Sequence, residues 1–164
     1  MKGNIEVRKA NISDINRIND IMFCINELRA KSTEYDDYKI YHSRSSLEEV
    51  LKGNKDEMIF IAVENKKVIG MLNFSFNNPN YMFFADKFIY INYLYVDTDY
   101  LQDEYKVECV TKKLFDNTII EMKKHGFKYI CADVLNKEDE LKKILEKNHM
   151  KSYRHRLCKK IKTV

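Results

Sequence analysis

The chain has 164 residues, of which 45% are hydrophobic and 33% are charged, and its formal net charge is +4. This length suits a single domain, expected over residues 1–164, that buries its own core, and the composition excludes a disordered or fibrous chain. No apolar run is long enough to span a membrane and the opening residues lack the apolar core of a signal peptide, so we expect a cytoplasmic protein.

The first half of the chain predicts a strand, two helices and a hairpin. "IEVRKA" is typical of a short strand, and "NISDINRINDIMFCINELRAK" carries isoleucines at helical spacing after a cap at Asn11 or Ser13. A second helix is predicted near "SSLEEVLKG", ending at Gly53. Two apolar runs in "MIFIAVENKKVIGMLNFSF", around the turn Glu64–Lys67, predict a hairpin.

The second half predicts strands alternating with helices. "KFIYINYLYV" is a nearly continuous apolar strand, and a long helix follows that ends at His125 and Gly126. "KYICADVL" predicts a strand, "KEDELKKILEKN" a helix, and the basic segment Lys151–Lys162 a last strand. The order β-α-α-β-β-β-α-β-α-β indicates an α/β (α+β) domain in which helices cover a mixed sheet.

These segments resemble the GNAT superfamily of acetyl-CoA-dependent N-acetyltransferases over essentially the whole chain. "FIAVENKKVIGMLNF" is similar to the family's hairpin, "YINYLYVD" to its fourth strand, and "KKHGFKYICADVLN" with "LEKNHM" to its later helix, strand and helix. The resemblance implies the GNAT fold, with a mixed, mostly antiparallel sheet flanked by helices. It also implies acetyl-CoA as co-substrate and a primary amine of a small molecule or peptide as acceptor.

The resemblance also implies where the cofactor lies. Backbone groups of Leu94, Tyr95 and Val96 would pair with the pantetheine arm, and Asn136 matches a family asparagine that reaches toward it. The pyrophosphate would lie on amides at the start of the long helix, where N–H groups are unpaired and carry partial positive charge. Counted back from Gly126, this loop contains Lys106, Val107, Glu108, Cys109, Val110 and Thr111. The same count predicts a buried face of the long helix that is formed by Val110, Leu114, Phe115, Ile119 and Met122.

This loop departs from the family pattern (Q/R)-x-x-G-x-(G/A). Val107, Cys109 and Thr111 occupy the glycine or alanine positions, so their Cβ atoms would crowd the pyrophosphate. About five extra residues lie within "TDYLQDE". Between Asp97 and Glu108 the sequence has five acidic residues and a single basic residue, Lys106. Two readings stay open: acetyl-CoA binding with altered geometry, or a loop that only links strand to helix.

The groups expected for catalysis are also altered. Acetyl transfer needs a neutral amine, donors for the oxyanion and a proton for the departing thiolate. Where the family places carboxylates on its fourth strand, this chain has Asn92 and Tyr93, which are the catalytic candidates. A tyrosine on a strand is more often a packing residue, so both roles stay open for Tyr93. The family's acid tyrosine falls on Leu145, and His149 is either a base or a solvated residue.

Several other features leave alternatives open. The domain could be a non-catalytic GNAT-fold module for binding or scaffolding that has lost its cofactor chemistry. Lys151–Lys162 is either a solvated strand face or a polyanion site, although a net charge of +4 does not favour nucleic acid. The aromatic segment Tyr81–Tyr90 forms either a homodimer contact or part of the core of the monomer. The acidic "STEYDDYKIY" is either an exposed loop or a segment that lines the acceptor side and attracts a cationic amine. Cys109 is a small hydrophobe or a nucleophile, and no metal-ligand spacing is present.

Overall fold

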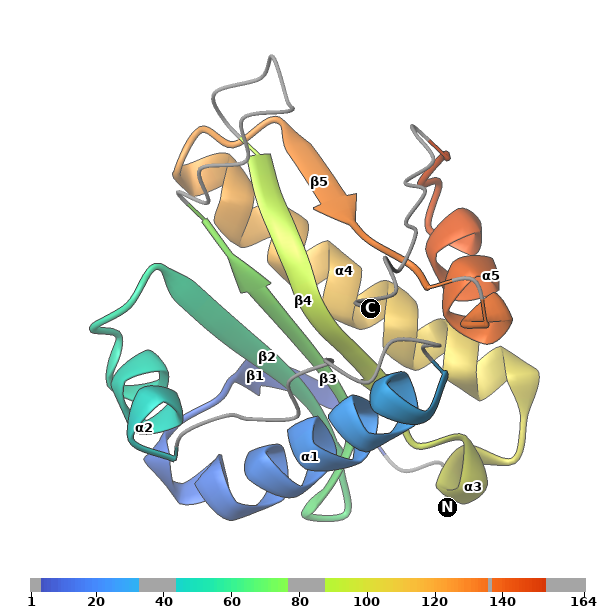
Figure 1. Ribbon diagram of the computed structural model, residues 1–164, viewed down its shortest axis with the longest axis horizontal. Helices are drawn as coiled ribbons and strands as arrows, with labels where there is room; N and C mark the ends of the chain where they lie inside the picture. The colour runs from blue at the N-terminus through green and yellow to red at the C-terminus, as the bar shows by residue number, and fades with distance from the viewer. Residues whose placement is uncertain (1–3, 33–43, 77–87, 136, 153–164) are drawn as a thin grey trace, which may run out of the picture.

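The computed structural model describes residues 4–32, 44–76, 88–135 and 137–152. Within these ranges five strands form one sheet in the order β1-β2-β3-β4-β5. Helices α1 and α2 cover one face of this sheet, and α4 covers the other face (Figure 1). The elements are β1 (Glu6–Lys9), the 3-10 helix η1 (Ile12–Asp14), α1 (Ile15–Ser32), α2 (Arg44–Lys52), β2 (Glu57–Glu64), β3 (Lys67–Ser75), β4 (Phe88–Val96), α3 (Thr98–Leu101), α4 (Glu104–Lys124), β5 (Tyr129–Ala132) and α5 (Asp139–Lys147).

The strand pairing confirms a mixed, mostly antiparallel sheet. β1 to β4 pair antiparallel with their neighbours, and β5 pairs parallel with β4. The hairpin between β2 and β3 turns through Asn65 and Lys66, both with positive φ, as a tight two-residue turn requires. The last expected strand lies mostly within residues 153–164, outside the described ranges, as does most of the segment expected at the acceptor side.

Two apolar clusters hold the helices on the sheet. One lies under α4 and contains Leu72, Ile89 and Leu114; the other lies under α1 and α2 and contains Ile18 and Ile61. The expected buried face of the long helix is confirmed at Val110, Leu114, Phe115 and Met122, while Ile119 is half-buried. The helices are therefore fixed by side chains on both sides of the strands that carry the site.

Gly70 on β3 lets α4 approach the sheet. A Cβ atom at this position would lie 2.7 Å from Val110 Cγ1 and 3.1 Å from Leu114 Cδ1. Valine is stiff at χ1, so Val110 cannot simply rotate away. The glycine is needed here for close packing of helix on strand.

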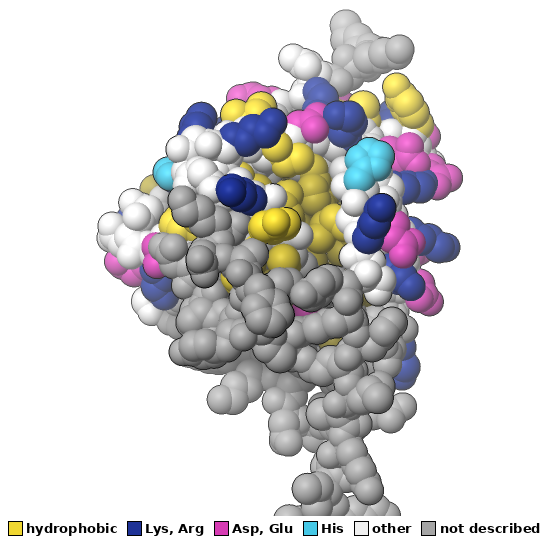
Figure 2. Space-filling view, turned by 90° about the horizontal axis from the view of Figure 1, so that it is seen from above, with side chains coloured by type: hydrophobic (Ala, Val, Ile, Leu, Met, Phe, Trp, Pro, Cys, Tyr) yellow, Lys and Arg dark blue, Asp and Glu magenta, His cyan; other side chains and the backbone are white. Residues whose placement is uncertain are grey.

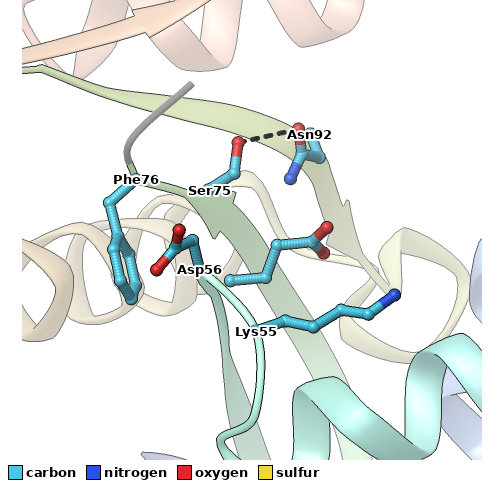
Figure 3. A pocket seen from close by; sticks show the side chains of 6 residues that line it. Lys55, Asp56, Ser75, Phe76 and Asn92 are labelled. Atoms are coloured by element: carbon cyan, nitrogen blue, oxygen red, sulfur yellow. Dashed lines mark hydrogen bonds between the residues drawn. The ribbon is translucent and has the colours of Figure 1, made fainter. Parts of the chain in front are cut away.

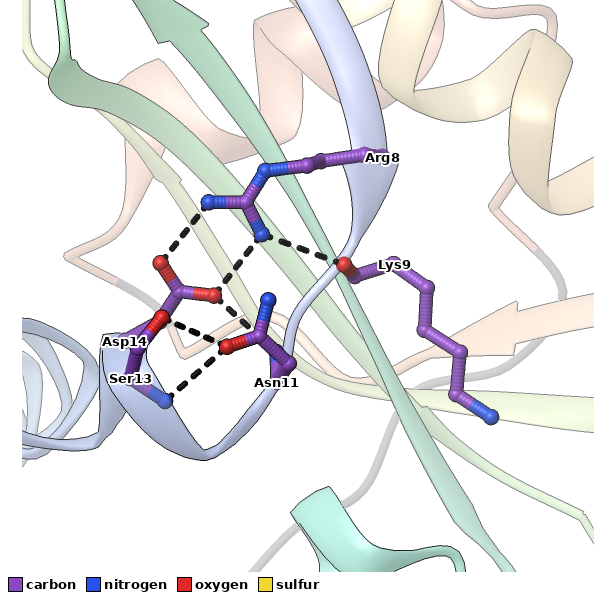
Figure 4. A network of polar contacts seen from close by, with 5 residues as sticks. All are labelled: Arg8, Lys9, Asn11, Ser13 and Asp14. Atoms are coloured by element: carbon purple, nitrogen blue, oxygen red, sulfur yellow. Dashed lines mark hydrogen bonds and ion pairs between the residues drawn. The ribbon is translucent and has the colours of Figure 1, made fainter.

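A polar network fixes the beginning of α1 (Figure 4). Asn11 caps η1, which continues directly into α1, and accepts a 2.9 Å hydrogen bond from the Ser13 amide. The Asp14 carboxylate accepts from the Asn11 amide and pairs with Arg8 at 2.8 Å, which lowers its pKa. Of the two expected caps, Asn11 is the one used.

The end of the sheet where β4 begins is partly apolar at its surface. Figure 2 looks onto this end and shows hydrophobic side chains gathered among Lys, Arg and His side chains. Phe76 packs against Phe127 with ring centroids 6.0 Å apart and stacks with His125 at 6.4 Å. None of the helices in the described ranges is both long and apolar enough to cross a membrane.

Candidate active site

A bulge in β4 places two consecutive side chains on the same face of the sheet. Asn73 pairs with Tyr93 and Phe74 pairs with Ile91, so Asn92 is the extra residue. Ile91 and Leu94 both belong to the cluster under α4, whereas Tyr93 belongs to the cluster under α1. The bulge therefore turns both catalytic candidates, Asn92 and Tyr93, toward α1 and α2.

β4 and β5 are paired only on the N-terminal side of this bulge. The parallel register runs from Phe88 with Tyr129 to Ile91 with Ala132 and ends there, while β4 continues to Val96 (Figure 1). Leu94, Tyr95 and Val96 pair with β3 on one side, and no strand of the described residues pairs with them on the other side. Backbone groups on this edge of β4 are therefore suited to pairing with a bound extended molecule.

Tyr93 is buried against α1. It is 8% exposed, and its hydroxyl donates a 3.1 Å hydrogen bond to Oδ1 of Asn26, which is 2% exposed. A buried phenol usually needs such a partner. This contact supports a packing role for Tyr93 and leaves Asn92 nearer to solvent.

Arg29 joins three parts of the fold at the bulge. Its Nη1 donates to the Asn92 carbonyl oxygen at 3.1 Å, and its Nε donates to Glu138 Oε1 at 2.8 Å. Its guanidinium carbon lies 5.6 Å from the centre of the Tyr93 ring. Sequence reasoning missed both Arg29 and Glu138, because 109 positions separate them and neither belongs to a motif.

A pocket of about 370 Å³ lies next to the bulge on the same face (Figure 3). Ser75 Oγ donates to Asn92 Oδ1 at 3.4 Å at its edge, and Asn73 Nδ2 reaches Glu57 Oε2 at 3.4 Å. The pocket carries two carboxylates and one ammonium, so its formal charge favours a cation. Its lining residues are Lys55, Asp56, Glu57, Ser75, Phe76 and Asn92.

Tyr90 is a second phenol on β4 that sequence reasoning did not select. Burial raises its pKa to about 12, and the charge of Asp133 and a hydrogen bond to it act in the same direction. A phenol with so high a pKa keeps its proton at neutral pH. Tyr90 lies on the N-terminal side of the bulge, where β4 is still paired with β5.

The inserted acidic segment forms an ordered turn, α3, before α4. Asp97 caps α3 by accepting from the Tyr100 amide at 3.0 Å, and Gln102 has a left-handed backbone after it. Leu101 is 3% exposed and anchors the turn in the core. The extra residues are therefore packed against the domain.

α4 begins earlier than the resemblance led us to expect. Its cap is Asp103, whose Oδ1 accepts from the Tyr105 amide at 3.0 Å, and the Val107 amide bonds to the Asp103 carbonyl at 3.1 Å. The amides from Val107 to Thr111 therefore lie within the helix, where they bond to carbonyl groups one turn back. Only the first turn, up to Lys106, presents outward amides.

The side chains of the expected loop divide between core and surface. Val110 and Thr111 are buried against the sheet, and Thr111 Oγ1 donates to the Val107 carbonyl. Cys109 is a half-buried free thiol. Asn136 lies outside the described residues. Leu145 is in the core, and His149 is exposed in the turn that ends α5.

Cations from elsewhere in the chain offset the acids around this helix start. Lys147 on α5 pairs with Glu104 at 2.7 Å and also with Glu108, which raises the pKa of Lys147 and lowers that of Glu104.

The negative charge of Asp97 is also offset by a cation from another element. Its carboxylate pairs with Lys67 at 2.9 Å. Burial alone would raise the pKa of Asp97, but the hydrogen bonds from Lys67 and the Tyr100 amide lower it. The repulsion toward a phosphate is smaller than the sequence count of acids suggests.

Comparisons with known proteins agree with this fold. Residues 23–139 match the model of the acetyltransferase (GNAT) family, whereas no curated protein matches. A mutant of the BH1408 protein from Bacillus halodurans has a TM-score of 0.77 at 17% identity, over 95% of this chain and 99% of that one.

Two further structures have the same fold. Aminoglycoside N-acetyltransferase AAC(6')-Iy in complex with CoA has a TM-score of 0.72 at 12% identity, over 99% of this chain and 98% of its own. A predicted acetyltransferase with acetyl-CoA from Clostridium acetobutylicum has a TM-score of 0.67 at 18% identity, over 96% of both chains. Because the family model covers most of the chain, the protein belongs to the GNAT family of acetyltransferases.

Proposed function

We propose that the protein is an N-acetyltransferase that moves an acetyl group from acetyl-CoA to a primary amine of a small molecule or peptide. The observation that carries this proposal is the bulge at Asn92 together with the end of β4–β5 pairing at Ile91. These two features open one edge of β4 beside a pocket that carries negative charge. Among structures of similar fold, AAC(6')-Iy has CoA bound and the acetyltransferase meta-AAC0020 has sisomicin bound.

The residues on the strand side fit acetyl-CoA. Leu94, Tyr95 and Val96 would pair with the pantetheine arm through backbone groups that β5 leaves open. At the helix side the first-turn amides and Lys106 would take the pyrophosphate, with Val107 to Thr111 supporting them from inside the helix. The Asp103 carboxylate is already on one of these amides and would have to yield or stay beside the phosphate. Asn136 remains a predicted contact.

The acceptor would reach the thioester from the α1 and α2 face. The incoming ammonium first loses one proton to solvent, because only the neutral amine has a lone pair. The nitrogen then bonds to the acetyl carbon, the carbon–sulfur bond breaks, and the second proton passes from the nitrogen to the departing CoA thiolate. Asn92 is the candidate for orienting the amine, because its side chain borders the pocket and its backbone forms the bulge. Tyr93 supports it from the α1 side through Asn26. The carboxylates of the pocket, Asp56 and Glu57, would attract the cationic amine.

Calorimetry and a thiol assay test this proposal together. Acetyl-CoA should bind with measurable heat, and free CoA should appear when amines from a broad panel are added. The absence of both heat and CoA release at millimolar acetyl-CoA would refute it. Cytoplasmic location and homodimer formation remain predictions from the sequence.

A second candidate is a non-catalytic GNAT-fold module for binding or scaffolding. It is favoured by the start of α4, because the Asp103 carboxylate already accepts a hydrogen bond from the Tyr105 amide, which a phosphate would need. Lys147 on α5 is likewise already paired with Glu104. This candidate predicts a folded protein without acetyl-CoA binding. Measurable CoA release with any amine would exclude it.

A further inference from the structure

The ion pair between Arg29 and Glu138 lies beside the centre of the proposed reaction. A single guanidinium joins the Glu138 carboxylate, at 2.8 Å, to the Asn92 carbonyl oxygen, at 3.1 Å. Both charged side chains are mostly buried, with 14% and 17% of their surfaces exposed. The pair connects the last turn of α1 to the bulge of β4 and to the residue before α5.

We propose that Glu138 selects cationic acceptors, and that Arg29 occupies the place of the acceptor ammonium until the acceptor binds. This inference rests on the proposed acetyl transfer, because it assigns the acceptor side of the same site. It names the class of acceptor: a primary amine that arrives protonated.

The chemistry of the two cations is the same at this place. The Arg29 guanidinium donates to the carboxylate through Nε and to the carbonyl oxygen through Nη1, and an ammonium group donates to either kind of acceptor. An amine paired with Glu138 would take the place of the cation that now joins this carboxylate to the bulge of β4. The Glu138 carboxylate therefore suits an acceptor ammonium near the proposed reaction centre.

The Glu138 side chain is oriented by hydrogen bonds that do not involve Arg29. Its second oxygen, Oε2, accepts a 2.8 Å hydrogen bond from the Leu135 amide. Its own amide donates to the Leu135 carbonyl at 2.9 Å. The carboxylate consequently keeps its orientation when its cation is exchanged, and an arriving amine finds a pre-organised acceptor of hydrogen bonds.

α1 and α5 each have anchors in the core besides the pair. α1 is anchored by Ile15, Ile18 and Ile21 in the core, and α5 is anchored by Leu145. Removal of one buried ionic partner usually destabilises a protein, because the other charge is left unpaired. Here an incoming ammonium would replace the lost cation at once, so the exchange keeps the carboxylate paired.

A three-variant titration tests the exchange. The probe is n-butylamine, with butan-1-ol as an uncharged control, and the readout is the NMR resonance of the Leu135 backbone amide, which reports on Glu138 in every variant. In R29Q the amine should bind about tenfold more tightly than in wild type, because its internal competitor is gone. In E138Q the saturable shift should disappear.

A matched control removes an arginine elsewhere. R44Q changes the net charge equally but lies on α2 in an exposed pair with Glu48, so its amine titration should equal that of wild type. If R29Q binds the amine no more tightly than wild type, or if butan-1-ol shifts the resonance equally, the exchange is refuted. Thermal unfolding is recorded for each variant; if E138Q does not fold, the comparison of R29Q with wild type decides.

The failure of the proposed function would look different. Acetyl-CoA binding is measured by calorimetry on the same four proteins, and its absence in all of them would refute acetyl transfer while the amine titration still stands. Acetyl-CoA binding and turnover without an R29Q effect would refute only the exchange.

Discussion

The two ends of the proposed site are built in opposite ways. At the bulge of β4 the polar groups come from α1, β4 and the segment before α5, and Arg29 joins them by donating to Glu138 and to the Asn92 carbonyl oxygen. At the start of α4 the first-turn amides are capped locally by Asp103, while Lys147 on α5 pairs with the nearby Glu104. The first end is assembled by tertiary contacts, whereas the helix amides of the second end are capped by the residue that precedes the helix.

This difference bears on which substrate is harder to bind. A cationic amine meets a pocket with surplus negative charge at the bulge end. A pyrophosphate at the other end meets first-turn amides beside carboxylates, of which Glu104 and Glu108 are paired with Lys147. We therefore expect acceptor recognition to be well developed and cofactor affinity to be the weaker step.

The largest expected effect comes from a substitution that disturbs the packing of α4 on the sheet, because the sheet carries the bulge and α4 carries the cofactor end of the site. Gly70→Val would place a Cβ atom 2.7 Å from Val110 Cγ1, and overpacking of this kind costs about 1–3 kcal/mol or more. The free energy of unfolding, measured in urea, should fall by that amount.

Gly53→Ala is the control for this variant. Nothing lies within 4 Å of an added Cβ atom at Gly53, so its effect should come from the positive φ alone and be smaller. Equal losses in the two variants would contradict the packing argument.

A smaller effect is expected at the bulge end from Tyr93→Phe. The change removes the hydrogen bond to Asn26 Oδ1, and the net contribution of such a bond to stability is about 0.5–1.5 kcal/mol. Because the hydroxyl points to α1, turnover per folded molecule should stay within about threefold of wild type, whereas loss of a general acid costs about 100-fold or more. A large fall in kcat with unchanged stability would assign Tyr93 to the chemistry.

The sequence predicted the fold and its buried faces well, because these follow from local patterns. The positions of Val110, Leu114 and Met122 on the inner face of α4 follow from helical spacing, and the hairpin turn follows from two apolar runs. The family resemblance also located the region of β4 that carries the bulge.

The detailed site could not be predicted, because it depends on contacts between distant segments. No local pattern reports that Arg29 meets Glu138, or that Lys147 offsets Glu104. The start of α4 was also misplaced by about one turn, since counting from Gly126 fixes the helix register but not its first residue. In this chain Asp103 caps the helix before the expected loop begins, and no glycine interrupts it.

Asp103 offers the next prediction, which acts on the cofactor end alone. Asp103→Asn keeps a good helix cap but removes the charge, so acetyl-CoA should bind about two- to fivefold more tightly at low salt with little change in stability. Asp103→Ala also removes the charge but loses the cap, which should lower the free energy of unfolding by about 1 kcal/mol. Calorimetry at two salt concentrations checks the first expectation, and weaker binding by the asparagine variant would show that Asp103 assists the cofactor.

The smallest expected effect is on stability, through Lys147→Gln. The pKa of Lys147 is raised and that of Glu104 is lowered, so both shifts favour the folded state while both groups are charged. This contribution is present at neutral pH. It is lost as pH falls through the lowered pKa of Glu104, and as pH rises through the raised pKa of Lys147. The pair is solvent-exposed, so the difference in unfolding midpoint between wild type and Lys147→Gln should be small at pH 7 and absent at pH values below the pKa of Glu104. A difference that persists unchanged in acid would mean that Lys147 acts by packing against α4.

The acetyl-CoA affinity of the same variant separates two roles for the lysine. The affinity should weaken if Lys147 turns from Glu104 to a bound phosphate, and it should stay constant if the lysine only joins α4 to α5.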